Sequence, residues 1–244
     1  MNYEDPTPSR KPDFSEKEEK KIWLSEQKSL RKLVGILGML LPLLLYVYLY
    51  IVTGHCCTLE SVSHYYFTRA GSIFTIVLSL LAIFLMIYKG KAKLDFILST
   101  AAGVFALCVI LFPTTNVKPE ICCDDNNKYI ITVLEISRGV RSTFHYVAAA
   151  IFLGCLAFMS IFIFTKSDKP RSLQTPKKKI RNVIYVVCGI LMLLALLVAF
   201  AGYKDWIDPD FYNSHHLTFW METIAVESFG FSWLVKGEFI LEDK

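Results

Sequence analysis

The sequence lacks the short motifs that usually identify an enzyme active site. It contains no G-x-S-x-G elbow of an α/β-hydrolase, no phosphate-binding glycine loop and no Rossmann fingerprint. It also lacks the metal-ligand spacings H-x-x-x-H and H-E-x-x-H. These absences argue against nucleotide-dependent enzymes and the common hydrolases, and they leave any catalytic activity undefined.

Charge is also scarce: only 20% of the 244 residues are charged, whereas 54% are apolar. A soluble domain of this size does not contain repeated apolar runs of about 20 residues, the length that spans a bilayer as a helix. Six such runs are present: Leu33–Thr53, Ala70–Tyr88, Asp95–Pro113, Phe144–Phe164, Asn182–Gly202 and Leu217–Val235. We therefore predict an all-α, polytopic membrane protein with six transmembrane helices in one bundle.

The basic residues predict the orientation of this bundle. Of the 26 Lys and Arg residues, 20 lie in connections on one side of the predicted membrane and six on the other. The positive-inside rule then places both termini in the cytoplasm, with the protein in the plasma (inner) membrane. Because these charges alternate by side, the net charge of +4 does not indicate nucleic-acid binding.

Three segments follow from this topology. Residues 1–32 form a cytoplasmic segment that we expect to be partly disordered and then, from about Ser15, an amphipathic helix. No cleavable signal peptide is recognised, so the first run is expected to be an uncleaved anchor. Residues 33–235 form the six-span domain, and residues 236–244 form a cytoplasmic tail.

The last apolar run carries two carboxyl groups, Glu222 and Glu227, and begins beside His215 and His216. A carboxylate near the centre of a bilayer costs about 2.5–3.5 kcal/mol on insertion scales unless it has a partner. All five histidines fall on the predicted outer side. This end of the bundle is therefore the candidate for a polar site.

Three interpretations of this site remain open. In the first, histidines with Glu222 bind a metal, for which Zn is the natural choice. In the second, Glu222 and Glu227 join arginines in a buried polar network or bind a polar ligand. In the third, Glu227 is structural and the histidines are surface groups. The candidate pocket residues are Glu222, Glu227, Ser63, Tyr65, Tyr66, Arg69, Arg138 and Arg141; the candidate metal ligands are His145, His215, His216 and His64.

Two cysteine pairs, Cys56-Cys57 and Cys122-Cys123, fall in predicted outer loops, where thiols can oxidise. We predict one or two disulfides joining the two loops. Vicinal bonds, metal binding and free thiols are the alternatives. Near the second pair, residues 129–134 are apolar and are compatible with a short interfacial helix. In the fourth run, the spacing of Ala150 and Gly154 permits close helix packing.

Four segments carry a resemblance to known families: SVSHYYFTR at 61–69, LFPT at 111–114, FWMETIA at 219–225 and FGFSWLVKGE at 229–238. They resemble bacterial six-span membrane proteins with no assigned activity. A more distant similarity is to alkaline ceramidases and progestin/adiponectin-type receptors, whose bundles hold zinc on histidines with a serine and an aspartate. This similarity implies comparable roles for Ser61 or Ser63, His145 and His215 or His216. The chain departs from that family because it lacks the H-x-x-x-H pair, the aspartate and a seventh span.

The favoured function is therefore an integral membrane protein whose outer polar pocket binds a small molecule or a lipid headgroup. A metal-dependent hydrolase of an amphiphilic substrate is the alternative, and a proton-coupled transporter is the third. The expected partners are the lipid bilayer and this ligand.

Overall fold

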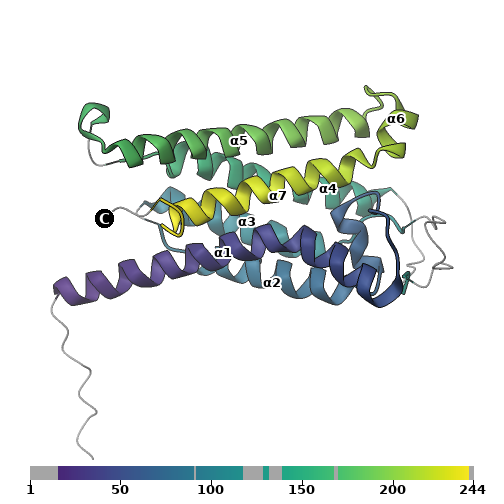
Figure 1. Cartoon of the computed structure of the whole chain (residues 1–244), viewed down its shortest axis with the longest axis horizontal. Coiled ribbons are helices and arrows are strands. Elements are labelled where there is room, and N and C mark those ends of the chain that lie inside the picture. The colour runs from purple at the N-terminus through teal and green to yellow at the C-terminus, as the bar shows by residue number, and fades with distance from the viewer. Residues whose placement is uncertain (1–15, 91, 118–128, 132–138, 168–169, 242–244) are drawn as a thin grey trace, which may run out of the picture.

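The computed structural model describes residues 16–90, 92–117, 129–131, 139–167 and 170–241. Residues 1–15, which include the segment predicted to be disordered, lie outside these ranges. The described residues are helical and contain no strand. Figure 1 shows the longer helices side by side. The helices are α1 (Glu16–Thr53), η1 (Val62–Phe67), α2 (Gly71–Ile87), α3 (Lys93–Leu111), α4 (Val140–Phe158), η2 (Met159–Ile163), η3 (Arg171–Leu173), α5 (Pro176–Tyr203), α6 (Pro209–Ser214) and α7 (Leu217–Lys236).

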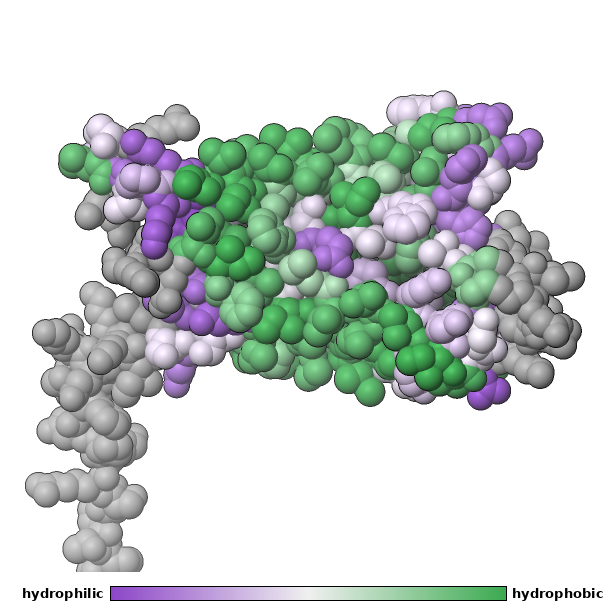
Figure 2. Space-filling view, viewed as in Figure 1, coloured by the Kyte–Doolittle hydropathy of each residue, from purple (hydrophilic) through white to green (hydrophobic). Residues whose placement is uncertain are grey.

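Four of these helices are long and apolar enough to cross a membrane: α1 from Ser25 onward, α3, α4 with its π-helical extension η2, and α5. The apolar helix α2 is shorter, at 17 residues. The molecule is therefore an all-α membrane protein, as predicted. At 20 residues α7 is as long as a span, but Glu222 and Glu227 make it more polar than the others. Figure 2 shows an extensive hydrophobic surface along the helices.

The helix predicted from Ser15 and the first apolar run form one continuous helix, α1, of 38 residues. The sequence predicted a helix from about Ser15 that leads into the first span, and it did not specify whether the two are continuous. The sequence from Glu16 to Leu33 contains no glycine or proline, so nothing in it interrupts the helix. Pro42 lies within α1 without ending it.

Helix α7 lies between α1 and α5 and packs along both (Figure 1). A Cβ atom added at Gly230 of α7 would lie 2.7 Å from the backbone oxygen of Gly35 in α1 and 2.8 Å from the amide nitrogen of Met39. Glycine is thus required where these two backbones approach each other. Gly154, by contrast, has no atom within 4 Å of an added Cβ, so it does not mark the close helix contact that its spacing suggested.

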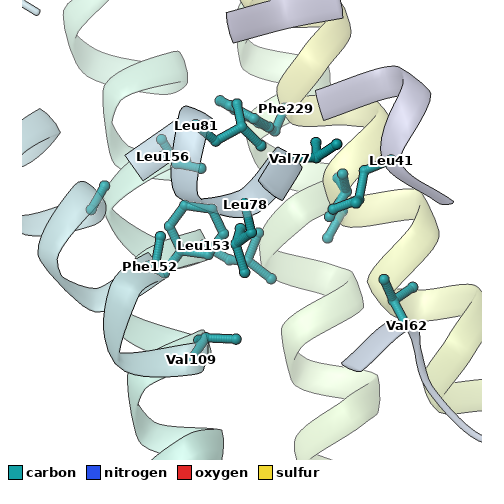
Figure 3. Packing of buried hydrophobic residues seen from close by; sticks show 14 of the residues in the cluster. Leu41, Val62, Val77, Leu78, Leu81, Val109, Phe152, Leu153, Leu156 and Phe229 are labelled. Atoms are coloured by element: carbon teal, nitrogen blue, oxygen red, sulfur yellow. The ribbon is translucent and has the colours of Figure 1, made fainter. Parts of the chain in front are cut away.

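The core is apolar along the length of the bundle. Figure 3 shows Leu78 and Leu81 of α2 close to Phe152, Leu153 and Leu156 of α4. A second group surrounds the fully buried Trp233, whose ring meets Tyr88, Phe164 and Phe229 at centroid distances of 5.1–5.9 Å. Aromatic pairs in this edge-to-face geometry stabilise a core beyond simple area burial.

Charged side chains close the end of the bundle opposite η1. Glu238, just after α7, pairs with Lys28 of α1 at 2.5 Å and with Arg181 of α5 at 3.9 Å. The Lys236 ammonium group donates to the Phe164 carbonyl at 3.1 Å. These contacts hold the end of α7 to α1, α4 and α5.

At the η1 end, residues 129–131 are not helical, contrary to the interfacial helix considered above. Ile130 forms an isolated antiparallel β-bridge with Thr68. Cys56 and Cys57 each take part in a disulfide bond. Cys108, Cys155 and Cys188 are free. Cys122 and Cys123 lie outside the described residues, so the predicted connection between the two loops stays a prediction.

Candidate functional site

The site is built around η1, a short 3₁₀-helix in the connection between α1 and α2. Ser61 has an extended backbone and caps this helix, because its hydroxyl accepts the His64 amide at 3.2 Å. Most of η1 is buried, including Val62, Ser63 and His64. A loop this polar and this buried depends on partners from the surrounding helices.

Glu222 of α7 supplies the first of these partners. Its carboxylate accepts the backbone amide of Val62 at 2.7 Å. This amide begins η1, so it has no acceptor within the helix itself. The carboxylate therefore meets the loop through a backbone donor, not through the arginines of the second interpretation. Arg141 instead donates to the Thr114 carbonyl at 3.0 Å.

His145 of α4 supplies the second partner. Its Nδ1 atom lies 3.0 Å from the Phe112 carbonyl oxygen and its Nε2 atom 3.1 Å from the Ser63 hydroxyl. A carbonyl oxygen can only accept, so Nδ1 carries the proton and Nε2 accepts from Ser63. Both ring nitrogens are thereby used to join α4, η1 and the end of α3.

A second serine–histidine pair lies within the loop. The Ser61 hydroxyl is 2.7 Å from Nδ1 of His64, and Nε2 of His64 is 3.7 Å from the Glu60 carboxylate. The order of groups resembles a hydrolase triad, but acyl transfer also needs donors for the oxyanion. The amide that directly follows Ser61 is that of Val62, and it is bonded to Glu222. The arrangement is therefore better suited to holding the loop than to nucleophilic catalysis.

A cavity of about 660 Å³ opens beside these groups, between α4, α5, α6 and α7. One part of its wall is apolar and comes from α4 and α5, with Val147, Ile151, Leu153, Leu196 and Ala199. The other part is polar and includes Ser61, His64, Thr114, His145, Tyr146, Tyr212, Asn213, His216 and Thr218. The size falls within the usual range for small-molecule sites.

The charges on this wall have one sign. Glu60, Asp205 and Glu222 line the cavity, and no lysine or arginine does so among the residues that the structure describes. Four aromatic side chains, Tyr146, Phe200, Tyr203 and Tyr212, lie on the same wall. Carboxylates and aromatic faces both attract cations.

The four candidate metal ligands do not gather into one centre. His145 uses both nitrogens as described above, and His64 is held by Ser61 and Glu60. His215 is exposed and lies 2.9 Å from the Phe211 carbonyl, whereas Nδ1 of His216 lies 3.3 Å from the Thr58 hydroxyl. Within the described ranges, no three His, Cys, Asp or Glu side chains form a group that could hold a metal. Among the described residues, the donor geometry thus does not fit the zinc ion of the first interpretation.

The other predicted pocket residues that the structure describes do not line the cavity. Tyr65 is fully buried, and burial raises the pKa of its hydroxyl above the usual range. Tyr66 is half-buried and its ring packs against Phe67 and Phe74, while Arg69 is exposed. Glu227 lies in α7 away from the cavity, and Arg138 lies outside the described residues.

Sequence reasoning missed the contribution of α6, which brings Tyr212 and Asn213 to the cavity. The Tyr212 hydroxyl accepts from Thr218 of α7 at 3.1 Å, and burial raises the pKa of Tyr212. Its local signal was present: Asp208 caps the helix by accepting the Phe211 amide at 2.8 Å, and Pro209 follows at the first helical position. His216 then adopts a left-handed conformation, with φ of 48°, at the turn into α7.

Comparison with protein-family models, with curated proteins and with solved structures found no match. The functional argument therefore depends on the chemistry of this cavity.

Proposed function

We propose that this chain is a six-span protein of the plasma (inner) membrane whose outer cavity binds a single-chain amphiphile with an amine headgroup. In this proposal α7 is the sixth span, both termini are cytoplasmic, and η1 and α6 lie at the outer surface. The observation that carries the proposal is the combined apolar and acidic wall of the cavity.

The apolar part of the wall supports an amphiphilic ligand. Val147, Ile151 and Leu153 of α4 face the same space as Leu196 and Ala199 of α5. Side chains of this kind have no hydrogen bond to offer, so they are suited to a hydrocarbon chain that gains free energy by leaving water. The polar part of the wall then receives the headgroup.

The acidic part of the wall supports an amine. A phosphate or carboxylate headgroup would meet Glu60, Asp205 and Glu222 without a compensating lysine or arginine on the described wall. An ammonium group gains attraction from the same carboxylates, and the tyrosine rings add cation–π contacts. The acidic residues of the cavity should therefore favour an amine over an acid that has a hydrocarbon chain of the same length.

The binding test compares dodecylamine with dodecanoic acid by competition against a fluorescent single-chain probe, using the protein in lipid nanodiscs. We expect the amine to bind about tenfold more tightly, because a single charge contact at an effective dielectric constant near 20 is worth several kcal/mol before desolvation is subtracted. Empty nanodiscs correct for partition into lipid. Equal affinity, or tighter binding of the acid, would contradict the proposed headgroup.

Two variants of α5 locate this binding. Ala199→Phe places a ring in the cavity and should weaken amine binding. Leu197→Phe places the same ring on the face of α5 that points away from the bundle, where the Leu197 side chain is 62% exposed. We expect only the first variant to lose affinity. Loss of affinity in both variants to the same extent would mean that the amine does not bind in this cavity.

The proposed topology has its own test. Asp210→Cys in α6 and Ser172→Cys in η3 each add one thiol at an exposed position, at opposite ends of the bundle, and their labelling is measured above that of the wild-type protein with its native cysteines. In whole cells, a membrane-impermeant maleimide should label the cysteine at position 210 and leave the one at position 172 unlabelled. The reverse pattern would invert the orientation, and labelling of both positions would mean that α5 does not separate them across the membrane.

A further inference from the structure

A second polar feature lies on the outer face of α7, away from the cavity. Trp220, Ile224, Glu227 and Phe231 follow each other at helical spacing, so they form one stripe along the helix. Trp220 is 49% exposed and Ile224 is 38% exposed, and Glu227 and Phe231 are half-buried. We call these four residues the α7 stripe.

The α7 stripe lies between two flanking helices. α7 packs against α1 on one side and α5 on the other (Figure 1), which leaves the stripe open along the space between them. Figure 2 shows pale and hydrophilic residues in a strip between the hydrophobic surfaces of these two helices. From Trp220 to Phe231 the stripe extends roughly 16 Å, at 1.5 Å of rise per residue.

Glu227 has no hydrogen bond or ion pair with any residue that the structure describes, in contrast to Glu222 on the same helix. It is the eleventh of the 20 residues of α7, so it lies at the middle of the helix. An open carboxyl group at this depth is unfavourable in hydrocarbon unless a partner provides a cation or a hydrogen-bond donor.

We propose that the α7 stripe is the docking surface for a transmembrane helix of another protein that carries a lysine or arginine near the middle of its span. Charge complementarity favours this partner, because its lysine or arginine would pair with the carboxyl group of Glu227. A second copy of this chain related by two-fold symmetry would bring two Glu227 side chains together and supply no cation. A helix also suits the length of the surface, because α7 runs between α1 and α5 and the stripe follows its axis (Figure 1).

The test uses a model helix as the probe: a tryptophan-flanked leucine peptide of spanning length with one central lysine, and the same peptide with leucine at that position. Energy transfer is measured in phosphatidylcholine vesicles between the labelled full-length protein and the labelled peptide. We expect the lysine peptide to associate about tenfold more tightly than the leucine peptide, in keeping with the strength of polar contacts between helices in lipid.

Matched variants assign the effect to the stripe. Glu227→Gln keeps the size of the side chain and removes its charge, so it should abolish the preference for the lysine peptide. Glu26→Gln makes the same change at an exposed position of α1, outside both the stripe and the cavity, and should keep the preference. An unchanged thermal unfolding temperature shows that Glu227→Gln is folded.

Three results would overturn the proposal. One is equal association of the lysine and leucine peptides with the wild-type protein. Another is energy transfer between copies of the protein alone that disappears in Glu227→Gln, which would assign the stripe to a homodimer. The third is displacement of the lysine peptide by dodecylamine from an Ala199→Phe variant, which would assign the stripe to an amphiphile.

Discussion

Replacing Glu222 by alanine is expected to disrupt the η1 end of the bundle and abolish binding in the cavity. The substitution removes the acceptor for the amide of Val62, which is a buried residue. A buried donor left without an acceptor costs about 1–3 kcal/mol, so this loss should lower the thermal unfolding temperature. Unfolding is measured in detergent, and binding with the fluorescent single-chain probe.

Glu222→Gln is the matched control, because its amide oxygen can still accept hydrogen bonds while the charge is lost. We expect this variant to retain most of the stability and to lose part of the preference for an amine over an acid. If Glu222→Ala unfolds at the wild-type temperature and binds the probe normally, the carboxylate does not hold η1 in place.

The second large effect is expected from Gly230→Ala, although it adds only one methyl group. The new Cβ would approach the Met39 side chain at 2.5 Å, the Gly35 carbonyl oxygen at 2.7 Å and the Met39 amide nitrogen at 2.8 Å. Two of these three contacts are with backbone atoms, so rotamer changes cannot relieve them. Overpacking of this kind costs about 1–3 kcal/mol, and we expect α1 to move away from α7.

Gly154→Ala is the control for this substitution, because an added Cβ there meets nothing within 4 Å. Alanine is the better helix former by about 1 kcal/mol, so this variant should be as stable as the wild type or slightly more so. Thermal unfolding temperatures of both variants, measured under the same conditions, test whether the close approach of α1 and α7 causes the loss of stability. Equal destabilisation by the two substitutions would remove the close α1–α7 approach as the cause.

The positions of the long helices could be predicted because long apolar runs signal them directly. The boundaries of α2 and α3 differ from the predicted runs by one or two residues, whereas α4 begins four residues earlier and α5 six residues earlier. The continuity of α1 was not predicted, since the polar start and the apolar run show different patterns while neither contains a break. The close approach of Gly35 and Gly230 depends on which helices become neighbours, which spacing within one helix does not reveal.

The sequence predicted which residues lie at the site better than it predicted the contacts that they make. Glu222, His64, His145 and His216 do lie on one cavity wall, as their common end of the bundle suggested. The partner of Glu222 could not be predicted, because backbone amides are present at every residue and become special only when η1 leaves them without an acceptor. Arginine side chains can be identified in a sequence, so they were considered as partners of Glu222. In the structure a backbone amide is its partner instead.

The position of α7 between α1 and α5 has a consequence for biogenesis. With two glutamates, this segment is the least favourable of the long helices for entering lipid alone, yet it emerges from the ribosome after both of its neighbours. The glycine contact with α1 and the Glu222 contact with η1 are therefore available when it inserts. In the proposed six-span topology, membrane integration of α7 should depend on helices that are already assembled, so that a defect in α1 would appear as a failure to insert α7, which begins 164 residues after α1 ends.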